Sequence, residues 1–245
     1  MSTFDPAAPS HLGQPVPGWC PPGPPGFNIL AGRAVRLEPL QADLHAADLY
    51  RAFAGHDGLW DYMPYGPFAS SSSYHRWAKE YEAREDPNFL VLRNLATGHC
   101  GGVAAWLRIA PEQGTIEVGH ICLAPELQRS LVFTEAMYLM MSWAFAAGYR
   151  RYEWKCNALN LASRRAAQRL GFSYEGTFRQ AAVVKGRNRD TAWFAVTDQD
   201  WPALAEAFKA WLAPSNFGAD GQQIERLSDL TRLVRVSDDP KLEPN

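Results

Sequence analysis

The chain has 245 residues, 47% of them apolar and 12% aromatic, which is enough to bury a sizeable core. Its 24 basic and 26 acidic residues nearly balance, which argues against an extended nucleic-acid-binding surface. No apolar run approaches the roughly 18 residues of a membrane span, and the N-terminus lacks the order of a secretory signal. We therefore expect a cytoplasmic protein without membrane or nucleic-acid partners.

The four cysteines lie far apart, at positions 20, 100, 122 and 156. They form neither a zinc-binding pattern nor a disulfide framework, which favours a reducing compartment. No metal is expected.

Charge is unevenly distributed along the chain. Residues 150–190 contain ten basic and three acidic side chains, whereas the rest of the chain has an acidic excess. A local basic excess in a nearly neutral protein favours a small polyanionic ligand.

Residues 1–28 are dominated by Pro, Gly and Ala, a composition that sustains neither a helix nor a regular strand. We predict an extended arm here, with Trp19 able to pack on the body or on a partner. One domain, residues 29–213, follows the arm, and residues 214–245 are predicted to be a polar tail.

Hydrophobic periodicity predicts alternating strands and helices within this domain. The predicted strands are 34–40, 89–95, 102–109, 116–123, 151–157, 172–184 and 191–196, with a hairpin turn at 96–101 and a connection at 185–190. The predicted helices are 42–54, 73–84, 133–147, 160–170 and 201–212, and the third is apolar on nearly every face.

The helix at 160–170 has a basic outer face. Asn160 can cap its first turn, and Gly171 can adopt the left-handed conformation that ends it. Arg165 and Arg169 lie one turn apart, away from a narrow apolar face. The pattern indicates a site for an anionic cofactor, although an ordinary surface helix with solvated arginines is the plainer interpretation.

Together with its Leu-Gly-Phe ending, this segment resembles the cofactor-contacting segment of the GNAT acyltransferases, in particular the branch of the ribosomal-protein alanine N-acetyltransferases. The resemblance covers about residues 30–213. It implies a mixed α/β (α+β) fold, with a central mixed, mostly antiparallel sheet flanked by helices. It also implies acetyl-CoA as co-substrate.

The resemblance further implies which residues bind the cofactor. Backbone groups of the strand at 116–123 would pair with the pantetheine amides, and the following loop would bind the pyrophosphate. The arginines of the next helix could reach a phosphate, and spacing does not say which one does. The expected cofactor-binding residues are Ile121, Cys122, Leu123, Gln128, Arg129, Ser130, Leu131, Val132, Phe133, Thr134, Asn160, Ser163, Arg164 and Arg165.

Two bulky residues depart from the family pattern in this loop. Relatives usually have Gly where Leu131 stands and Gly or Ala where Phe133 stands, because a bare backbone approaches a phosphate closely. Leu131 must therefore keep a negative φ or accept strain, and both side chains must turn inward or crowd the pyrophosphate.

Acyl transfer to an amine needs a base for the amine and an acid for the departing thiolate. Glu117 matches the position of a base in this branch, with His120 second. Alternation places Glu117 with Ile121 on one sheet face and His120 on the other. Both can serve one site only if the strand bulges, which Gly119 would make easy.

The family's acidic tyrosine is absent, because its position is occupied by Ala167. Ser163 is the replacement candidate, and a thiolate could also leave through water. A solvated or structural carboxylate remains the alternative interpretation of Glu117.

The acceptor groove of the family corresponds to an aromatic cluster between the first two helices. The expected acceptor-binding residues are Trp60, Tyr62, Tyr65 and Arg187. Lys185, Arg187 and Arg189 in the predicted turn at 185–190 could also read an acceptor carboxylate. Aromatic loops also cap cores, however, and charges in turns are more commonly only solvated. The acceptor is a small-molecule or peptide amine, and a homodimer is possible.

We predict an acetyl-CoA-dependent N-acetyltransferase that works by direct attack in a ternary complex. The alternative is a non-catalytic acyl-CoA-binding or protein-interaction module on the same fold.

Overall fold

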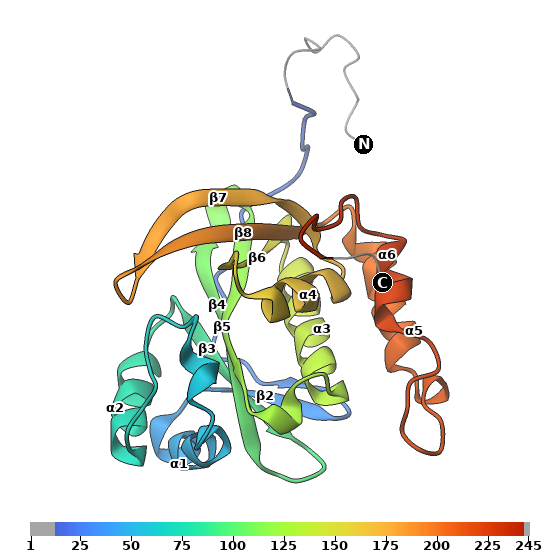
Figure 1. Cartoon of the computed structure of the whole chain (residues 1–245). Helices are drawn as coiled ribbons and strands as arrows, with labels where there is room; N and C mark the ends of the chain where they lie inside the picture. The colour runs from blue at the N-terminus through green and yellow to red at the C-terminus, as the bar shows by residue number, and fades with distance from the viewer. Residues whose placement is uncertain (1–12, 243–245) are drawn as a thin grey trace.

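The structure, a computed structural model, describes residues 13–242. An eight-stranded sheet in the order β1-β2-β3-β4-β5-β6-β8-β7 forms its centre (Figure 1). All neighbouring strands are antiparallel except β5 and β6, so the predicted mixed, mostly antiparallel sheet is confirmed. The strands are β1 (Leu30–Ala31), β2 (Val35–Pro39), β3 (Asn88–Asn94), β4 (Cys100–Ala110), β5 (Thr115–Leu123), β6 (Arg151–Asn157), β7 (Ser173–Val184) and β8 (Arg187–Thr197).

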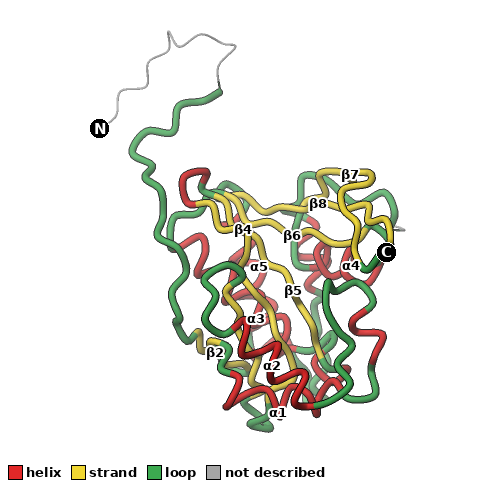
Figure 2. The backbone as a smooth tube through the Cα atoms, turned by 90° about the vertical axis from the view of Figure 1, so that its left-hand side faces the viewer, coloured by secondary structure: helices red, strands yellow, loops and turns green. Residues whose placement is uncertain are grey.

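Helices cover the two sheet faces unequally. The larger core lies between the sheet and α3, α4 and α5, whereas α1 and α2 share a smaller core with β3, β4 and β5. Figure 2 views the molecule with α1 and α2 in front and shows them over the lower part of the sheet, away from β7 and β8. The helices are α1 (Ala42–Phe53), α2 (Ser71–Tyr81), α3 (Leu131–Ala146), α4 (Leu161–Arg169), α5 (Trp201–Leu212) and α6 (Leu227–Arg232).

Capping residues set the helix boundaries. Ser70 and Ser73 form a capping box, so α2 begins two residues earlier than the periodicity predicts. The Ser130 hydroxyl caps α3 by accepting the N–H of Phe133, so this helix begins at Leu131, two residues earlier than predicted. Asn160 caps α4 and Gly171, with a φ of 91°, ends it, as predicted.

The connection between β7 and β8 is shorter than predicted. Lys185 and Gly186 both have positive φ values, 49° and 72°, which is the geometry of a two-residue hairpin turn. Residues 187–190 therefore extend β8 rather than forming a loop. Arg187, predicted in the turn, is the first residue of a strand.

A buried carboxylate joins α3 to the first strands. Glu135 accepts the backbone N–H groups of Arg33, Ala34 and Val35, at 2.9, 2.6 and 3.0 Å. Gly32 leaves room for this carboxylate, since a Cβ there would lie 2.4 Å from the Glu135 carboxyl carbon. The second turn of α3 is thereby fixed relative to the sheet, close to the predicted cofactor loop.

The described part of the N-terminal arm packs on the body. Trp19 donates its indole N–H to the carbonyl of Gly148 at 3.3 Å, and the Tyr149 hydroxyl donates to the carbonyl of Gly23 at 3.2 Å. Residues 1–12 of the predicted arm lie outside the described residues.

The segment predicted to be a polar tail is part of the packed fold up to residue 242. It includes α6, whose buried Thr231 donates its hydroxyl to the carbonyl of Arg169 at the end of α4. Further along, the N–H of Val236 donates to the Ser173 hydroxyl at 3.0 Å. The prediction failed because these partners lie about 60 residues away in sequence. Within residues 13–242, none of the helices combines the length and apolar character needed to cross a bilayer.

Candidate active site

The two parallel strands separate at the middle of the sheet. β5 and β6 pair only from Thr115 to Val118 and from Arg151 to Trp154, although both strands continue beyond this pairing. The later part of β5 therefore presents backbone groups to the β6 side without a strand partner. These residues include Ile121, Cys122 and Leu123, the strand positions expected to bind pantetheine.

A bulge in β5 lies at the point of separation. His120 has a φ of 51°, and the register with β4 shifts between Gly119 and Cys122. The extra residue places His120 on the same face as Glu117, where the His120 ring stacks on Tyr65. The simple alternation that separates Glu117 from His120 is therefore wrong, because the strand bulges beside Gly119, which is the condition for both residues to serve one site.

A second bulge, in β4, brings a cation to Glu117. Arg108 has a φ of 47°, and the register with β5 shifts between Leu107 and Ala110. The Asp86 carboxylate stabilises this turn by accepting the N–H groups of Arg108 and Ile109, at 3.1 and 3.0 Å. The Arg108 side chain then reaches Glu117 rather than solvent alone.

Glu117 is a buried carboxylate held between two cations. It is 2% exposed, its Oε1 lies 2.7 Å from Arg108 Nη1, and its Oε2 lies 2.9 Å from Lys155 Nζ. Burial raises the pKa of the Glu117 carboxyl, against the lowering effect of Arg108 and Lys155. Lys155 also contacts Glu153 at 2.6 Å and lies 3.8 Å from the ring centroid of Trp193.

His120 is neutral at physiological pH. Burial, followed by the nearby charges of Arg108 and Arg189, lowers the pKa of the imidazole to about 4. The Tyr65 hydroxyl lies 2.9 Å from His120 Nδ1, and the two rings are nearly parallel. Burial also raises the pKa of Tyr65 well above its ordinary value, so this phenol keeps its proton. The hydrogen bond therefore fixes the orientation of the neutral imidazole on the face that carries Glu117.

The loop before α3 offers free backbone donors. Ser130 accepts the N–H of Phe133 through its hydroxyl and that of Thr134 through its carbonyl, which removes Phe133 and Thr134 from the predicted set of phosphate donors. The buried Thr134 hydroxyl is also occupied, since it donates to Ser130 O and accepts from Arg169. Within residues 13–242, the N–H groups of residues 129–132 have no protein acceptor.

The bulky residues of this loop turn inward. Leu131 is the first helical residue and keeps a negative φ, whereas the exposed Arg129 adopts the left-handed conformation, with a φ of 58°. Phe133 is 7% exposed and lies in the larger core, against which Leu131 also packs. Gln128 donates its side-chain amide to the carbonyl of Leu123 at 3.2 Å.

The residues of helix α4 that have predicted roles lie in different surroundings. The Asn160 side chain accepts the N–H of Ser163 at 3.0 Å, which confirms its capping role. The Ser163 hydroxyl accepts the Trp154 indole N–H at 3.0 Å, so it lies on the helix-covered face, opposite Glu117 and His120. Arg165 is exposed and makes no ion pair within the described chain.

The prediction that Arg164 binds a phosphate is wrong. Its side chain is 1% exposed and forms two hydrogen bonds with Asp239, at 2.6 and 2.5 Å, while Nη1 donates to the carbonyl of Ala158. The guanidinium is therefore neutralised inside the protein by the C-terminal segment and is not available to a ligand.

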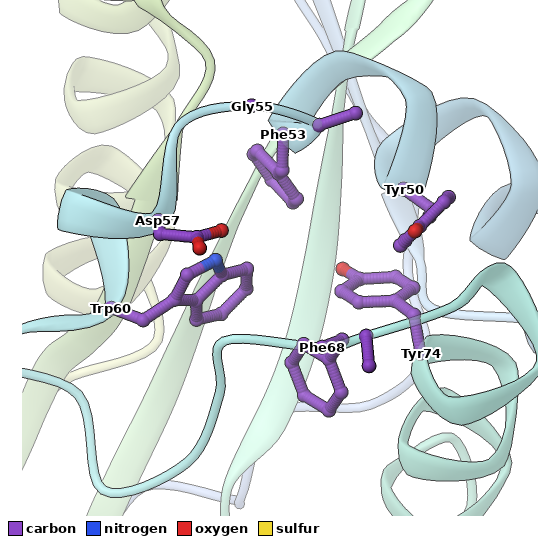
Figure 3. Close-up of a pocket in the computed structure, with 9 residues that line it drawn as sticks. Tyr50, Phe53, Gly55, Asp57, Trp60, Phe68 and Tyr74 are labelled. Carbon is purple, nitrogen blue, oxygen red and sulfur yellow. The ribbon is translucent and has the colours of Figure 1, made fainter.

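Trp60, one of the predicted acceptor-binding residues, is instead part of the core. It is 3% exposed and packs edge-on against Phe53 and Phe68. Figure 3 shows Trp60 in the wall of a pocket of about 330 Å³ between α1 and α2, and neither Glu117 nor His120 lines that pocket.

Two of the other predicted acceptor residues, Tyr62 and Arg187, are more accessible, whereas Tyr65 is largely buried against His120. Tyr62 is 39% exposed and donates to the carbonyl of Leu159, and Arg187 is exposed. Lys185 Nζ donates to the carbonyls of Trp60 and Gly66, both at 2.8 Å, and so ties the tip of the β7–β8 hairpin to the aromatic loop that carries Tyr65.

Comparison with known proteins decides the family. The sequence model of the Acetyltransferase (GNAT) domain matches residues 34–173, more than half of the chain. The protein belongs to the GNAT acetyltransferase family. A comparison with curated protein sequences found no match.

Two solved GNAT structures are similar over most of the chain. A GCN5-related N-acetyltransferase from Brucella melitensis is 43% identical, with 89% of this chain and 100% of that chain covered and a TM-score of 0.86. A probable GNAT-family acetyltransferase from Chromobacterium violaceum is 40% identical, with coverages of 82% and 100% and a TM-score of 0.74. RimL, a ribosomal L7/L12 α-N-protein acetyltransferase, is 19% identical, with coverages of 74% and 99% and a TM-score of 0.61, a likeness of fold alone.

Two cations of this GNAT site were missed from the sequence: Arg108 and Lys155. A signal existed for Lys155, because the strand Arg151–Asn157 alternates polar and apolar residues and so places its charges on one face. No comparable signal existed for Arg108, whose position depends on a bulge at a residue other than glycine. Within residues 13–242, no group of three or more potential ligands is arranged to hold a metal ion.

Proposed function

We propose that this GNAT protein transfers an acetyl group from acetyl-CoA to a primary amine by direct attack in a ternary complex. The observation that carries the proposal is the bulge at His120. It places Glu117 and His120 on one face, next to the stretch of β5 that lacks a strand partner. The backbone groups that would bind a thioester therefore lie next to the side chains that would accept a proton from an amine.

The chain's own groups fit an extended, anionic thioester. Backbone groups of residues 121–123 would hold the pantetheine arm, and the free N–H groups of residues 129–132, at the positive end of α3, would hold the pyrophosphate. Arg129 and Arg165 are exposed cations for the phosphates. Acetyl-CoA supplies the activated acyl group when it is bound.

Glu117 is assigned as the general base and acts through water, because its carboxylate is almost fully buried. Its raised pKa suits this role, and Arg108 and Lys155 fix its orientation. The neutral His120, held by Tyr65, lines the path of the proton. Ser163 lies on the opposite sheet face, where its hydroxyl meets the Trp154 indole N–H and the Cys156 thiol, so the departing thiolate takes its proton through water.

Thiol release from acetyl-CoA in the presence of a panel of amines tests this function, with the acetylated product identified by mass spectrometry. Wild-type protein should release thiol only when an acceptor is present. Binding of CoA without release for any amine would instead support the non-catalytic module, which the missing tyrosine at Ala167 also favours. Failure to bind CoA would overturn both.

A further inference from the structure

Arg189 lies over the candidate active site. It shares a face of β8 with Thr191 and Trp193, because alternate residues of the strand point the same way and Arg189 Nε donates to Thr191 Oγ1 at 3.2 Å. On one side of Arg189, the Lys155 ammonium lies over the ring of Trp193. On the other side, Lys185 fastens the hairpin tip to the loop that carries Tyr65. Arg189 therefore lies between two fixed parts of the site, the Trp193–Lys155 contact and the hairpin tip at Lys185.

Two carboxylates on this face, Glu117 and Glu153, are already paired with cations of the chain. Glu117 is paired with Arg108 and Lys155, and Glu153 with Lys155 and Arg151. Within residues 13–242, Arg189 has no carboxylate partner. Its bond to Thr191 uses one of five guanidinium N–H donors and leaves the others without a protein acceptor.

Arg189 is only partly exposed, so its unpaired charge is costly in the free protein. Burial is the main cause that lowers the pKa of the guanidinium, and the positive charge of Arg108 adds to it, against the raising effects of Cys156 and Glu117. An anion from outside the chain would reduce the repulsion between the guanidinium groups of Arg108 and Arg189, which lie near Glu117. The same field disfavours a polyamine, whose additional ammonium groups would meet these cations.

We propose that the amine acceptor carries an acidic group, a carboxylate or a phosphate, and that Arg189 binds this group while the amine faces Glu117 and His120. This inference rests on the proposed acetyl transfer. A planar guanidinium binds either anion through paired hydrogen bonds, which would also orient the amine relative to the thioester. Arg189 is then a specificity-determining residue.

Matched amines test the inference. The two pairs are O-phosphoethanolamine with ethanolamine, and β-alanine with its amide, each compared as kcat/KM corrected for the fraction of neutral amine. The wild-type protein should favour an acidic member by at least about tenfold, since a hydrogen bond between charged groups typically contributes roughly this much or more. The pair that shows the preference identifies carboxylate or phosphate as the group that is bound.

Arg189→Gln should reduce kcat/KM for the preferred acidic amine by about 10- to 100-fold and change the neutral partner by less than about threefold. The KM for acetyl-CoA should stay constant, and Arg189→Lys should restore part of the preference. Arg232→Gln, an exposed arginine in α6, is the matched control.

Equal rates for acidic and neutral amines, or an equal loss on both in Arg189→Gln, would overturn this inference and leave acetyl transfer intact. Absence of thiol release with every amine would overturn the proposed function and this inference with it.

Discussion

The buried ion pair between Arg164 and Asp239 makes a strong prediction about stability and cofactor binding. Both side chains are 1% exposed or less, and the carboxylate accepts two hydrogen bonds from the guanidinium. In Asp239→Asn the shape is kept but the charge is lost, and Arg164 becomes an uncompensated buried cation. Breaking a buried pair in this way costs about 3–5 kcal/mol. Since Asn can still accept one hydrogen bond, we expect a loss near the lower end, about 3 kcal/mol.

The ion pair also holds α4 in place. Arg164 lies in the same turn as Arg165 and follows the Asn160 cap, so loosening the pair should displace groups proposed to contact acetyl-CoA. We expect CoA affinity to fall several-fold in Asp239→Asn. Urea unfolding followed by tryptophan fluorescence measures the free energy of unfolding, and calorimetry measures CoA binding.

Asp238→Asn is the matched control for this substitution. Asp238 is the neighbouring residue, and its own side chain is 63% exposed, although its partner Arg235 is 5% exposed. Its loss should be smaller, about 1 kcal/mol, because water solvates the Asp238 carboxylate and Arg235 keeps its hydrogen bond to the carbonyl of Gln168. The double variant Arg164→Met with Asp239→Leu should recover most of the stability lost in Asp239→Asn, because a buried ion pair can be replaced by apolar packing. The reasoning would be refuted if Asp239→Asn were no more destabilising than Asp238→Asn.

Three further predictions concern the cofactor loop, the pH dependence of stability and the base. The double variant Leu131→Gly with Phe133→Ala should melt earlier and bind CoA more weakly, with about 3–5 kcal/mol lost from Phe133 alone because that side chain lies in the core. Glu38→Gln should cost about 2–3 kcal/mol at pH 7, because a hydrogen bond from Arg93 lowers the pKa of Glu38 from 4.5 to about 2. That stability is present above the unfolded pKa and is lost as the pH falls from about 5 to 2. Glu117→Gln should lower turnover by at least about 100-fold and leave the KM for acetyl-CoA nearly unchanged.

Each of these predictions has an outcome that contradicts it. Tighter CoA binding by the double loop variant would show that Leu131 and Phe133 crowd the pyrophosphate. A stability difference for Glu38→Gln that is the same at pH 7 and pH 2 would mean that ionisation of Glu38 is not its source; exposed Glu206→Gln is the control and should show little difference at either pH. Unchanged turnover across the pH range in Glu117→Gln would transfer the role of base to His120 or to solvent.

Much of the fold could be predicted because local patterns set it. Alternating residues gave the strands, and the apolar helix at 133–147 had to lie in the main core. The signals at Asn160 and Gly171 depend only on nearby backbone and correctly bounded α4. Ser130 is a local signal of the same kind, and treating it as the cap would have placed the start of α3 correctly.

The missed features depend on contacts between distant segments. Arg164 and Asp239 are 75 residues apart, and Glu135 binds backbone groups about 100 residues before it. Sequence spacing assigned Arg164 to a ligand because it shows a cation on a helix but not the carboxylate that will neutralise it. The same limit applies to Trp60, whose burial follows from the rings that surround it.

The two bulges explain how the sheet face proposed to be catalytic carries so many charges and yet remains ordered. A regular β4–β5 ladder would point Glu117 and His120 to opposite faces and leave Glu117 without Arg108. Positive φ values at His120 and Arg108, neither of them glycine, are unfavourable conformations that the surroundings must stabilise. Asp86 stabilises one by accepting two backbone N–H groups, and the stacked Tyr65 ring stabilises the other. Strained backbone held in this way on both sides of one buried carboxylate is typical of a functional site, and it is an argument for catalysis at Glu117 that does not depend on family resemblance.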